Sequence, residues 1–207
     1  RANLKSNKKK FIYLISPNKI SNDFYTNLKL VLNTGKVSFF QLRLKNYTKN
    51  QKIKIGKKIK NICKKNSVKF IINDDPFLAS ILDVDGCHLG QNDMDIKKAK
   101  KILKKKIIGV TCHNSLSLAK KAVKDKADYI AFGAFYSSKT KKTNFVASTN
   151  ILKKVKKFTK TPIVAIGGIN FDNYKNLLLN KANFLAISGY IWKNKKYKPL
   201  QAIERLK

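Results

Sequence analysis

The residues best suited to chemistry in this chain are a few acids in a strongly basic sequence. Only 11 of the 207 residues are Asp or Glu, against 46 Lys and Arg. Asp74 follows the apolar run 68–73, and Asp93 follows the next apolar run along the chain. Carboxylates at the ends of adjacent strands can hold Mg²⁺, which takes few protein carboxylates and completes its shell with phosphate oxygens and water. The pair therefore predicts a magnesium site that a diphosphate would complete.

The acids next to this pair have a structural interpretation. Asp75 precedes Pro76 and the apolar stretch "FLASIL", which is typical of a helix N-cap followed by proline at the first helical position. An N-cap role stays open as the alternative for Asp74, where the metal is favoured. Three further acids are expected to lie in turns or caps: Asp83, Asp85 and Asp95.

Basic side chains supply the complementary part of the predicted site. Arg43 is the only arginine away from the two ends of the sequence, and it alternates with Gln41 and Lys45. A period of two in an extended chain points all three side chains the same way. A planar guanidinium suits a two-pronged phosphate contact, with an ordinary ion pair as the alternative. The stretch "SSKTKKT" (137–143), which contains Lys141, offers further hydroxyl and ammonium groups to a polyanion.

The elements that must position these residues are predicted from the apolar pattern. Lysine-rich segments with helical spacing, such as 51–65 and 115–127, separate the apolar runs. The eight runs resemble strands buried on both faces: 11–16, 37–43, 68–73, 86–90, 107–112, 128–133, 162–168 and 184–189. We expect an α/β fold, a compact (β/α)8 TIM barrel forming a single domain over 1–207, with residues 1–10 as a basic N-terminal extension. A doubly wound open sheet is the second choice.

Polar signals gather where the predicted strands end, and in such a barrel these ends build the active site. Thr111 ends the fifth run, Gly168 the seventh and Ser188 the eighth. Glycines at the ends of strands allow backbone N–H groups to approach a phosphate. Any one of these glycines could instead serve only to form a turn. His88 is expected to be a hydrogen-bonded core residue, and His113 stays open between a structural and a ligand-contacting role.

Composition narrows the remaining function classes. The net charge of +35 fits either anion binding or a surface on which lysine is the default residue, and the scattered lysines favour the second. Three widely spaced cysteines predict reduced thiols in a cytoplasmic protein rather than a disulfide framework. No apolar run is long enough to span a bilayer, and the first ten residues do not resemble a secretory signal. We expect no membrane partner.

Several motifs together resemble the thiamine phosphate synthase family. Seven stretches occur in order between residues 11 and 192: "QLRLK", "IINDDPFLA", "DGCHLGQNDM", "IIGVTCH", "ADYIAFGAFYSSKTKK", "PIVAIGGI" and "LAISGYIW". The resemblance implies a (β/α)8 barrel that joins hydroxymethylpyrimidine diphosphate to a thiazole phosphate with Mg²⁺ as cofactor. It implies Asp74 and Asp93 as the metal ligands, and Arg43 and Lys141 as the catalytic residues. The implied pyrimidine diphosphate ligands are Gln41, Arg43, Lys45, Asn73, Thr111 and Lys141. The implied thiazole phosphate ligands are Ser138, Thr140, Gly168, Ile187 and Ser188.

The implied reaction is dissociative, so that diphosphate departs before the thiazole nitrogen captures the pyrimidinyl-methyl cation. Two alternatives stay open. A thiazole tautomerase on the same fold would not need the acid pair and its basic partners. A basic nucleic-acid-binding module would show a recognised motif or a basic stripe with aromatics, and the sequence has neither, so no specific nucleic acid is expected. Small phosphorylated substrates are the predicted partners, and a homo-oligomer stays open.

Overall fold

The computed structural model describes residues 10–137 and 146–207. Within them eight parallel strands form a closed barrel in the order β1 to β8. The strands are β1 (Ile12–Ile15), β2 (Val37–Leu42), β3 (Lys69–Asn73), β4 (Gly86–Leu89), β5 (Ile107–Thr111), β6 (Tyr129–Phe132), β7 (Ile163–Ile166) and β8 (Phe184–Ile187). Pairing of β1 with β8, where Leu14 lies beside Ile187, closes the sheet. The predicted barrel is therefore confirmed, and the open sheet is excluded.

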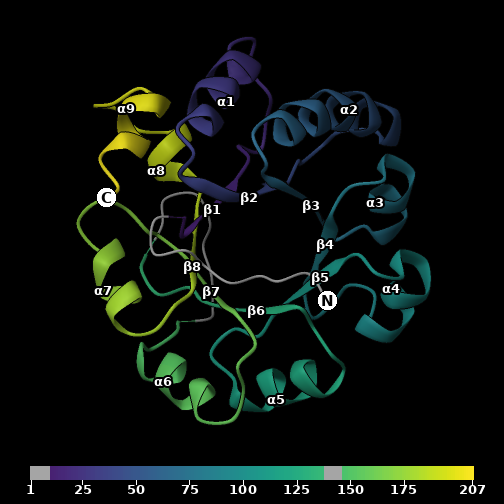
Figure 1. The fold of residues 1–207 in the computed structure, drawn as a ribbon, viewed down its shortest axis with the longest axis vertical. Coiled ribbons are helices and arrows are strands. Elements are labelled where there is room, and N and C mark those ends of the chain that lie inside the picture. Colours follow the sequence, from purple (N-terminus) through teal and green to yellow (C-terminus); the bar gives the residue numbers. More distant parts are fainter. Residues whose placement is uncertain (1–9, 138–145) are drawn as a thin grey trace.

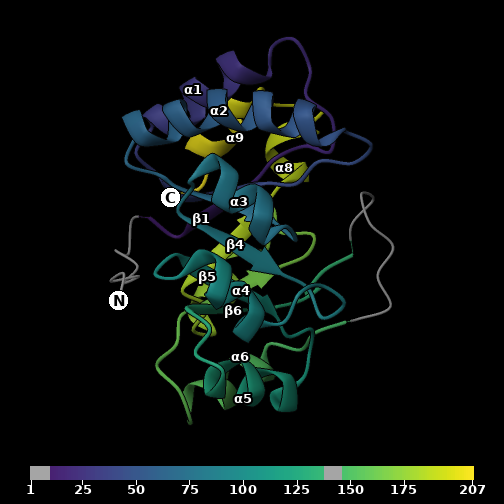
Figure 2. The same ribbon diagram turned by 90° about the vertical axis from the view of Figure 1, so that its right-hand side faces the viewer.

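Helices follow the strands and form a ring around the barrel (Figure 1). They are α1 (Phe24–Asn33), α2 (Lys49–Lys65), α3 (Pro76–Leu82), α4 (Ile96–Leu103), α5 (Leu116–Lys124), α6 (Asn150–Lys156), α7 (Tyr174–Leu179), α8 (Gly189–Trp192) and α9 (Pro199–Glu204). In the side view, α1 and α2 lie at one side of the ring and α5 and α6 at the opposite side (Figure 2). The predicted helices at 51–65 and 115–127 are α2 and α5.

Local sequence explains where these helices begin. Thr48 and Gln51 form a capping box at the start of α2, in which the Gln51 N–H donates to Thr48 Oγ1 (3.2 Å) and the Thr48 N–H donates to Gln51 Oε1 (2.9 Å). Ile59 and Cys63 face the sheet from the same helix, as their spacing predicts. Most lysines of α2 are exposed to solvent, which is the expected use of a default surface residue.

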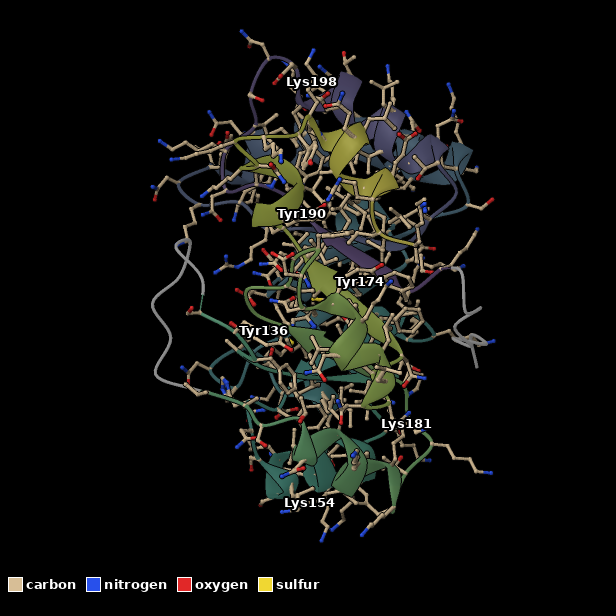
Figure 3. The ribbon with its side chains drawn as sticks, turned by 90° about the vertical axis from the view of Figure 1, so that its left-hand side faces the viewer. Tyr136, Lys154, Tyr174, Lys181, Tyr190 and Lys198 are labelled. Carbon is tan, nitrogen blue, oxygen red and sulfur yellow. The ribbon has the colours of Figure 1, made fainter. Side chains whose placement is uncertain are left out.

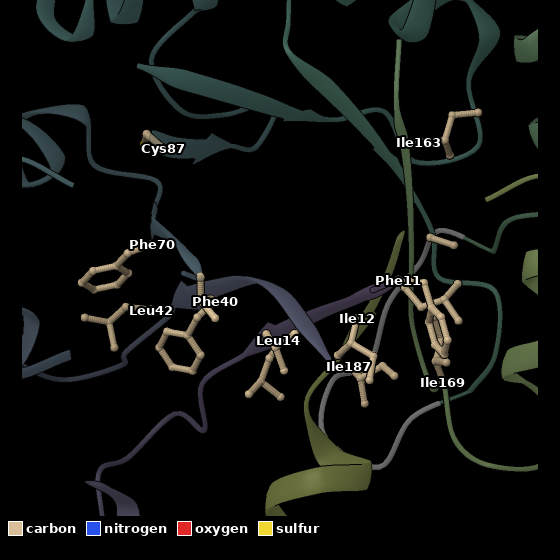
Figure 4. Close-up of a cluster of buried hydrophobic side chains, with 14 of the residues drawn as sticks. Phe11, Ile12, Leu14, Phe40, Leu42, Phe70, Cys87, Ile163, Ile169 and Ile187 are labelled. Atoms are coloured by element: carbon tan, nitrogen blue, oxygen red, sulfur yellow. The ribbon is translucent and has the colours of Figure 1, made fainter. Parts of the chain in front are cut away.

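Two cores hold the barrel together, because each strand buries both faces. Side chains such as Leu14, Phe40 and Phe70 lie in the larger core between the sheet and the helices (Figure 4). Side chains such as Tyr13, Phe39 and Tyr129 fill the interior of the barrel. The strands therefore show near-continuous apolar sequence instead of alternation. All three cysteines are buried and free, as predicted.

No helix among the described residues is long and apolar enough to cross a membrane.

Candidate active site at the barrel mouth

The predicted site residues that the structure describes lie at one end of the barrel. Asn73 and Thr111 are the last residues of β3 and β5, and Ile187 is the last residue of β8. Because all strands are parallel, their carboxyl ends meet at the same mouth. Ser138, Thr140 and Lys141 lie outside the described residues, so their predicted roles stay predictions.

Gln41 and Arg43 come from the end of β2 but have different surroundings. Gln41 is only 3% exposed, and its Nε2 donates to the Tyr13 hydroxyl inside the barrel (2.8 Å). Arg43 follows the strand and is partly buried, whereas Lys45 is exposed. The sequence pattern therefore brings the three residues to the same edge, with increasing exposure from Gln41 to Lys45.

Ser16 is a residue of this region that sequence reasoning missed. Its Oγ accepts a hydrogen bond from the Arg43 N–H (2.8 Å) and donates to the Arg43 carbonyl (3.2 Å). The Ser16 carbonyl accepts from Ser188 Oγ (3.2 Å), so the ends of β1, β2 and β8 are tied together. Ser16 is 2% exposed, and burial of its hydroxyl requires such partners. A serine after a strand is otherwise an ordinary turn residue, and the sequence offered no stronger signal.

Asp74 and Asp93 come from the ends of β3 and β4, and their carboxyl groups lie within hydrogen-bonding reach of each other. The Asp74 backbone adopts a left-handed conformation, with φ of 66°, and its N–H donates to the His88 carbonyl (2.8 Å). On the other side, the Gly90 N–H donates to Asp93 Oδ2 (2.7 Å). These backbone contacts hold the two acids against each other.

The electrostatics of this pair fit a cation. The pKa of Asp74 is raised to about 6, first because its carboxyl group is desolvated and second because the Asp93 carboxyl hydrogen-bonds to it and repels its charge. Arg43 acts in the opposite direction but does not cancel the rise. A divalent cation between the two carboxylates would relieve this repulsion. Across the described residues no group of three or more His, Cys, Asp or Glu side chains could hold a metal ion, so further ligands would come from substrate and water.

The neighbouring acids have the structural roles that the sequence predicted. Asp75 caps α3, where its Oδ1 accepts from the Leu78 N–H (2.9 Å). Asp95 caps α4 in the same way, accepting from the Lys98 N–H (2.9 Å). Asp85 accepts from the Phe70 N–H (2.8 Å), and Asp83 ends α3 and pairs with Lys106 (2.7 Å).

His88 is a hydrogen-bonded histidine on β4, as expected. Its Nδ1 lies 2.9 Å from the Tyr129 hydroxyl, and its Nε2 lies 2.8 Å from Thr111 Oγ1. Burial lowers its pKa to about 4, so the ring is neutral near pH 7. Both ring nitrogens are thus engaged inside the barrel. His113 follows β5 with φ of 50°, and its carbonyl accepts from the Gly133 N–H (3.1 Å).

Gly167 and Gly168 at the end of β7 allow a close approach to the chain that follows β6. Both have positive φ values, 108° and 60°. A Cβ on Gly168 would lie 2.5 Å from the Ser137 carbonyl oxygen, and one on Gly167 would lie 2.4 Å from the Ala134 Cβ. The glycines are thus required by backbone geometry and packing, whatever they contribute to a phosphate site.

A cavity of about 500 Å³ lies outside the barrel, near α7 and α9, and none of the predicted site residues lines it. Tyr174 is one of its lining residues (Figure 3). The Arg205 guanidinium carbon lies there 4.3 Å from the Phe171 ring centroid and 4.5 Å from that of Tyr197. The arrangement fixes the last helix of the described chain by cation–π contacts.

Comparisons with known proteins identify the family of the chain. The family model described as thiamine monophosphate synthase matches residues 12–191 of the chain. The chain belongs to the thiamine monophosphate synthase family. Membership in this family makes it an enzyme of thiamine biosynthesis, a transferase.

Individual members of the thiamine monophosphate synthase family show how far the likeness extends. Thiamine-phosphate synthase of Pelagibacter ubique (strain HTCC1062) is 68% identical over 207 residues, covering 99% of this chain and 100% of the relative. The enzyme of the same name from Erythrobacter litoralis (strain HTCC2594) is 38% identical, covering 92% of each chain. A solved structure of thiamine phosphate pyrophosphorylase from Pyrococcus furiosus superimposes with a TM-score of 0.85 at 29% identity, covering 97% of this chain and 94% of that one.

Proposed function

We propose that this chain joins hydroxymethylpyrimidine diphosphate to a thiazole phosphate, forming thiamine phosphate and diphosphate with the assistance of Mg²⁺. The observation that carries the proposal is the pair Asp74 and Asp93, held together at the mouth with Arg43 close enough to lower the pKa of Asp74. A thiazole tautomerase would have no use for such a pair. Membership in the thiamine monophosphate synthase family supports the same choice.

Asp74 and Asp93 would hold the metal ion, each through a carboxylate oxygen. Mg²⁺ bound there would neutralise charge on the leaving diphosphate. Arg43 would present its guanidinium to the same diphosphate, in an orientation that the two Ser16 hydrogen bonds to its backbone support. Lys141 is the predicted second cation for this charge.

The proposed reaction breaks one bond and forms one bond, and neither step requires an acid or a base. The bond between the methylene carbon and the diphosphate oxygen breaks, and the electron pair leaves with diphosphate. The thiazole nitrogen then supplies its lone pair to the resulting pyrimidinyl-methyl cation and forms the new carbon–nitrogen bond. His88 is neutral and has both ring nitrogens in hydrogen bonds, which supports a reaction in which His88 abstracts no proton.

Asn73 and Thr111, with Gln41, are proposed to bind the pyrimidine, and Lys45 its diphosphate. Asn73 ends β3 and Thr111 ends β5, and Gln41 lies near the end of β2. The residues proposed for the thiazole phosphate are Ser138, Thr140, Gly168, Ile187 and Ser188. Among those that the structure describes, Gly168 follows β7, Ile187 ends β8 and Ser188 comes directly after it. Binding in this arrangement would place the two reacting carbon and nitrogen atoms over the centre of the barrel.

The Asp74→Ala variant tests the metal assignment. We expect its Mg²⁺-dependent turnover to fall below one per cent of wild type, roughly the effect of losing several kcal/mol of charge stabilisation. The matched control is Asp75→Asn, which removes the adjacent charge but leaves an amide oxygen to cap α3. Circular dichroism establishes that both variants fold. Near-normal turnover of Asp74→Ala would contradict the assignment.

A further inference from the structure

A line of hydrogen-bonded side chains crosses the interior of the barrel beneath the mouth. It begins with Gln41 Nε2, which donates to the Tyr13 hydroxyl (2.8 Å). The hydroxyl groups of Tyr13 and Tyr129 are 2.6 Å apart. The Tyr129 hydroxyl contacts His88 Nδ1 (2.9 Å), and His88 Nε2 contacts Thr111 Oγ1 (2.8 Å). The line thus joins five strands and ends at two of the proposed pyrimidine ligands.

Packing fixes the members of this line in place. Tyr13 and Tyr129 are each 1% exposed, and their rings meet edge to face with centroids 5.6 Å apart. The Tyr129 ring is stacked on His88 with an interplanar angle of 17°. Gly109 provides the room, because a Cβ there would lie 1.9 Å from the Tyr129 Cζ. Burial raises the pKa of both tyrosine hydroxyls and lowers that of His88, so every member is neutral near pH 7.

The number of available donor protons decides which atom donates in each hydrogen bond of this line. Gln41 is a donor to Tyr13, so the Tyr13 oxygen already accepts one bond and its own proton needs an acceptor. Tyr129 is that acceptor if it donates in turn to His88 Nδ1. The single proton of neutral His88 then resides on Nε2 and is donated to Thr111 Oγ1. The reverse direction would require the Gln41 amide to turn by 180°, because only its carbonyl oxygen could accept the buried Tyr13 proton.

We propose that this one-way line of donors positions the pyrimidine-binding groups by holding His88 as the Nε2–H tautomer. The Gln41 amide is turned so that Nε2 donates to Tyr13, which leaves its side-chain carbonyl oxygen available to accept from a ligand. Thr111 accepts from His88, so its hydroxyl proton is the group left to donate. An aminopyrimidine ring carries an amine donor beside a ring-nitrogen acceptor, which complements these two groups. This step rests on the proposed function, whereas the tautomer itself does not.

Tyr13, Tyr129 and His88 are positioning residues in this proposal, since they act on the substrate only through Gln41 and Thr111. Their contribution is to hold an amide and a hydroxyl in a single donor–acceptor orientation before the ligand arrives. Without the line, the Gln41 amide could rotate and present its NH₂ group, which would repel the amine of the ring.

The tautomer is measured directly by long-range ¹H–¹⁵N correlation spectra of ¹⁵N-histidine-labelled protein without substrate. The chain has only two histidines, so a His113→Gln variant assigns both sets of signals. We expect His88 to carry its proton on Nε2, with Nδ1 unprotonated, throughout the range from about pH 6 to 8. A His88 protonated on Nδ1 would overturn the proposal.

The kinetic test uses Tyr129→Phe, which removes one hydroxyl from the line and keeps the ring. The matched control is Tyr174→Phe, because Tyr174 is also 1% exposed and its hydroxyl bonds to the Lys207 carbonyl (3.1 Å), away from the mouth. We expect the KM for the pyrimidine diphosphate to rise about tenfold in Tyr129→Phe, and the KM for the thiazole phosphate to stay within about twofold. Tyr174→Phe should change neither constant.

Equal kinetics in the two variants, or equal increases in both KM values for Tyr129→Phe, would overturn the positioning role. A wild-type protein that makes no product contradicts the proposed function instead. In that case the tautomer spectrum, which needs no substrate, still decides whether the line runs from Gln41 to Thr111.

Discussion

Replacing Asp74 by asparagine is expected to stabilise the metal-free protein, even though it removes an acid from a chain of net charge +35. The reason is the raised pKa of Asp74, which shows that the folded state disfavours its charged form. An asparagine in the same place has no charge to desolvate and can donate its amide to Asp93. The variant would thus lose the proposed metal ligand and gain stability.

The magnitude follows from the pKa. A rise from 3.8 to about 6 sets an upper bound of about 3 kcal/mol, since each unit corresponds to about 1.4 kcal/mol. Asp74 as a whole residue is exposed even though its carboxyl group is partly desolvated, so water screens much of this energy, and we expect a gain of about 1 kcal/mol at pH 8. The folded state retains the proton to higher pH than the unfolded state, so the wild type loses stability as pH rises from about 4 to about 6. The gain of the variant therefore appears above pH 6 and vanishes near pH 4.

Urea unfolding at pH 8 and pH 4, with EDTA present, measures this difference. Asp75→Asn is the control, because it makes the same charge change one residue away and keeps an N-cap acceptor. Mg²⁺ with inorganic diphosphate should raise the midpoint of thermal unfolding of the wild type and leave that of Asp74→Asn unchanged. The reasoning is refuted if Asp74→Asn is no more stable than the control at pH 8, or if its gain is as large at pH 4.

Four further outcomes are expected. Arg43→Lys should lower kcat/KM roughly 10- to 100-fold through loss of the two-pronged contact, and an unaffected enzyme would leave Arg43 as an ordinary surface cation. Asp75→Ala should lower the free energy of unfolding by about 1 kcal/mol in urea titrations, because the Leu78 N–H loses its cap; an unchanged value would contradict the cap. Gly109→Ala should destabilise by about 3 kcal/mol or more, since its Cβ would displace Tyr129, and a stability within about 0.5 kcal/mol of wild type would contradict that packing. Binding to a random DNA duplex in a filter assay should largely disappear by about 0.2 M salt, whereas tight binding that survives would indicate a nucleic-acid function.

Much of the fold was predictable because its signals are local. Strands buried on both faces show as apolar runs, and Asp75 with Pro76 marks the start of α3 within a few residues. In a barrel of parallel strands the carboxyl ends all meet at one mouth, so Asp74, Asp93 and Arg43 are placed there without any knowledge of their contacts. Their roles as metal and diphosphate ligands remain predictions.

Features that depend on closure of the barrel were not predictable. Tyr13 and Tyr129 are 116 residues apart in sequence, and only the register of the closed sheet brings their hydroxyl groups together. The sequence around Gly109 does not indicate why a glycine is needed there. The structure shows that the Tyr129 ring occupies the space that a Cβ would fill. The left-handed backbone of Asp74 depends in the same way on a hydrogen bond to the His88 carbonyl of the neighbouring strand.

Synthesis of thiamine phosphate tests the central claim most directly. Purified protein is mixed with hydroxymethylpyrimidine diphosphate, thiazole phosphate and Mg²⁺, and both thiamine phosphate and released diphosphate are quantified by chromatography over time. The account predicts the two products in equal amounts, with no product when Mg²⁺ is replaced by EDTA or when the pyrimidine substrate is omitted. Fully folded protein that forms no thiamine phosphate, or that forms it equally well in EDTA, would contradict the account.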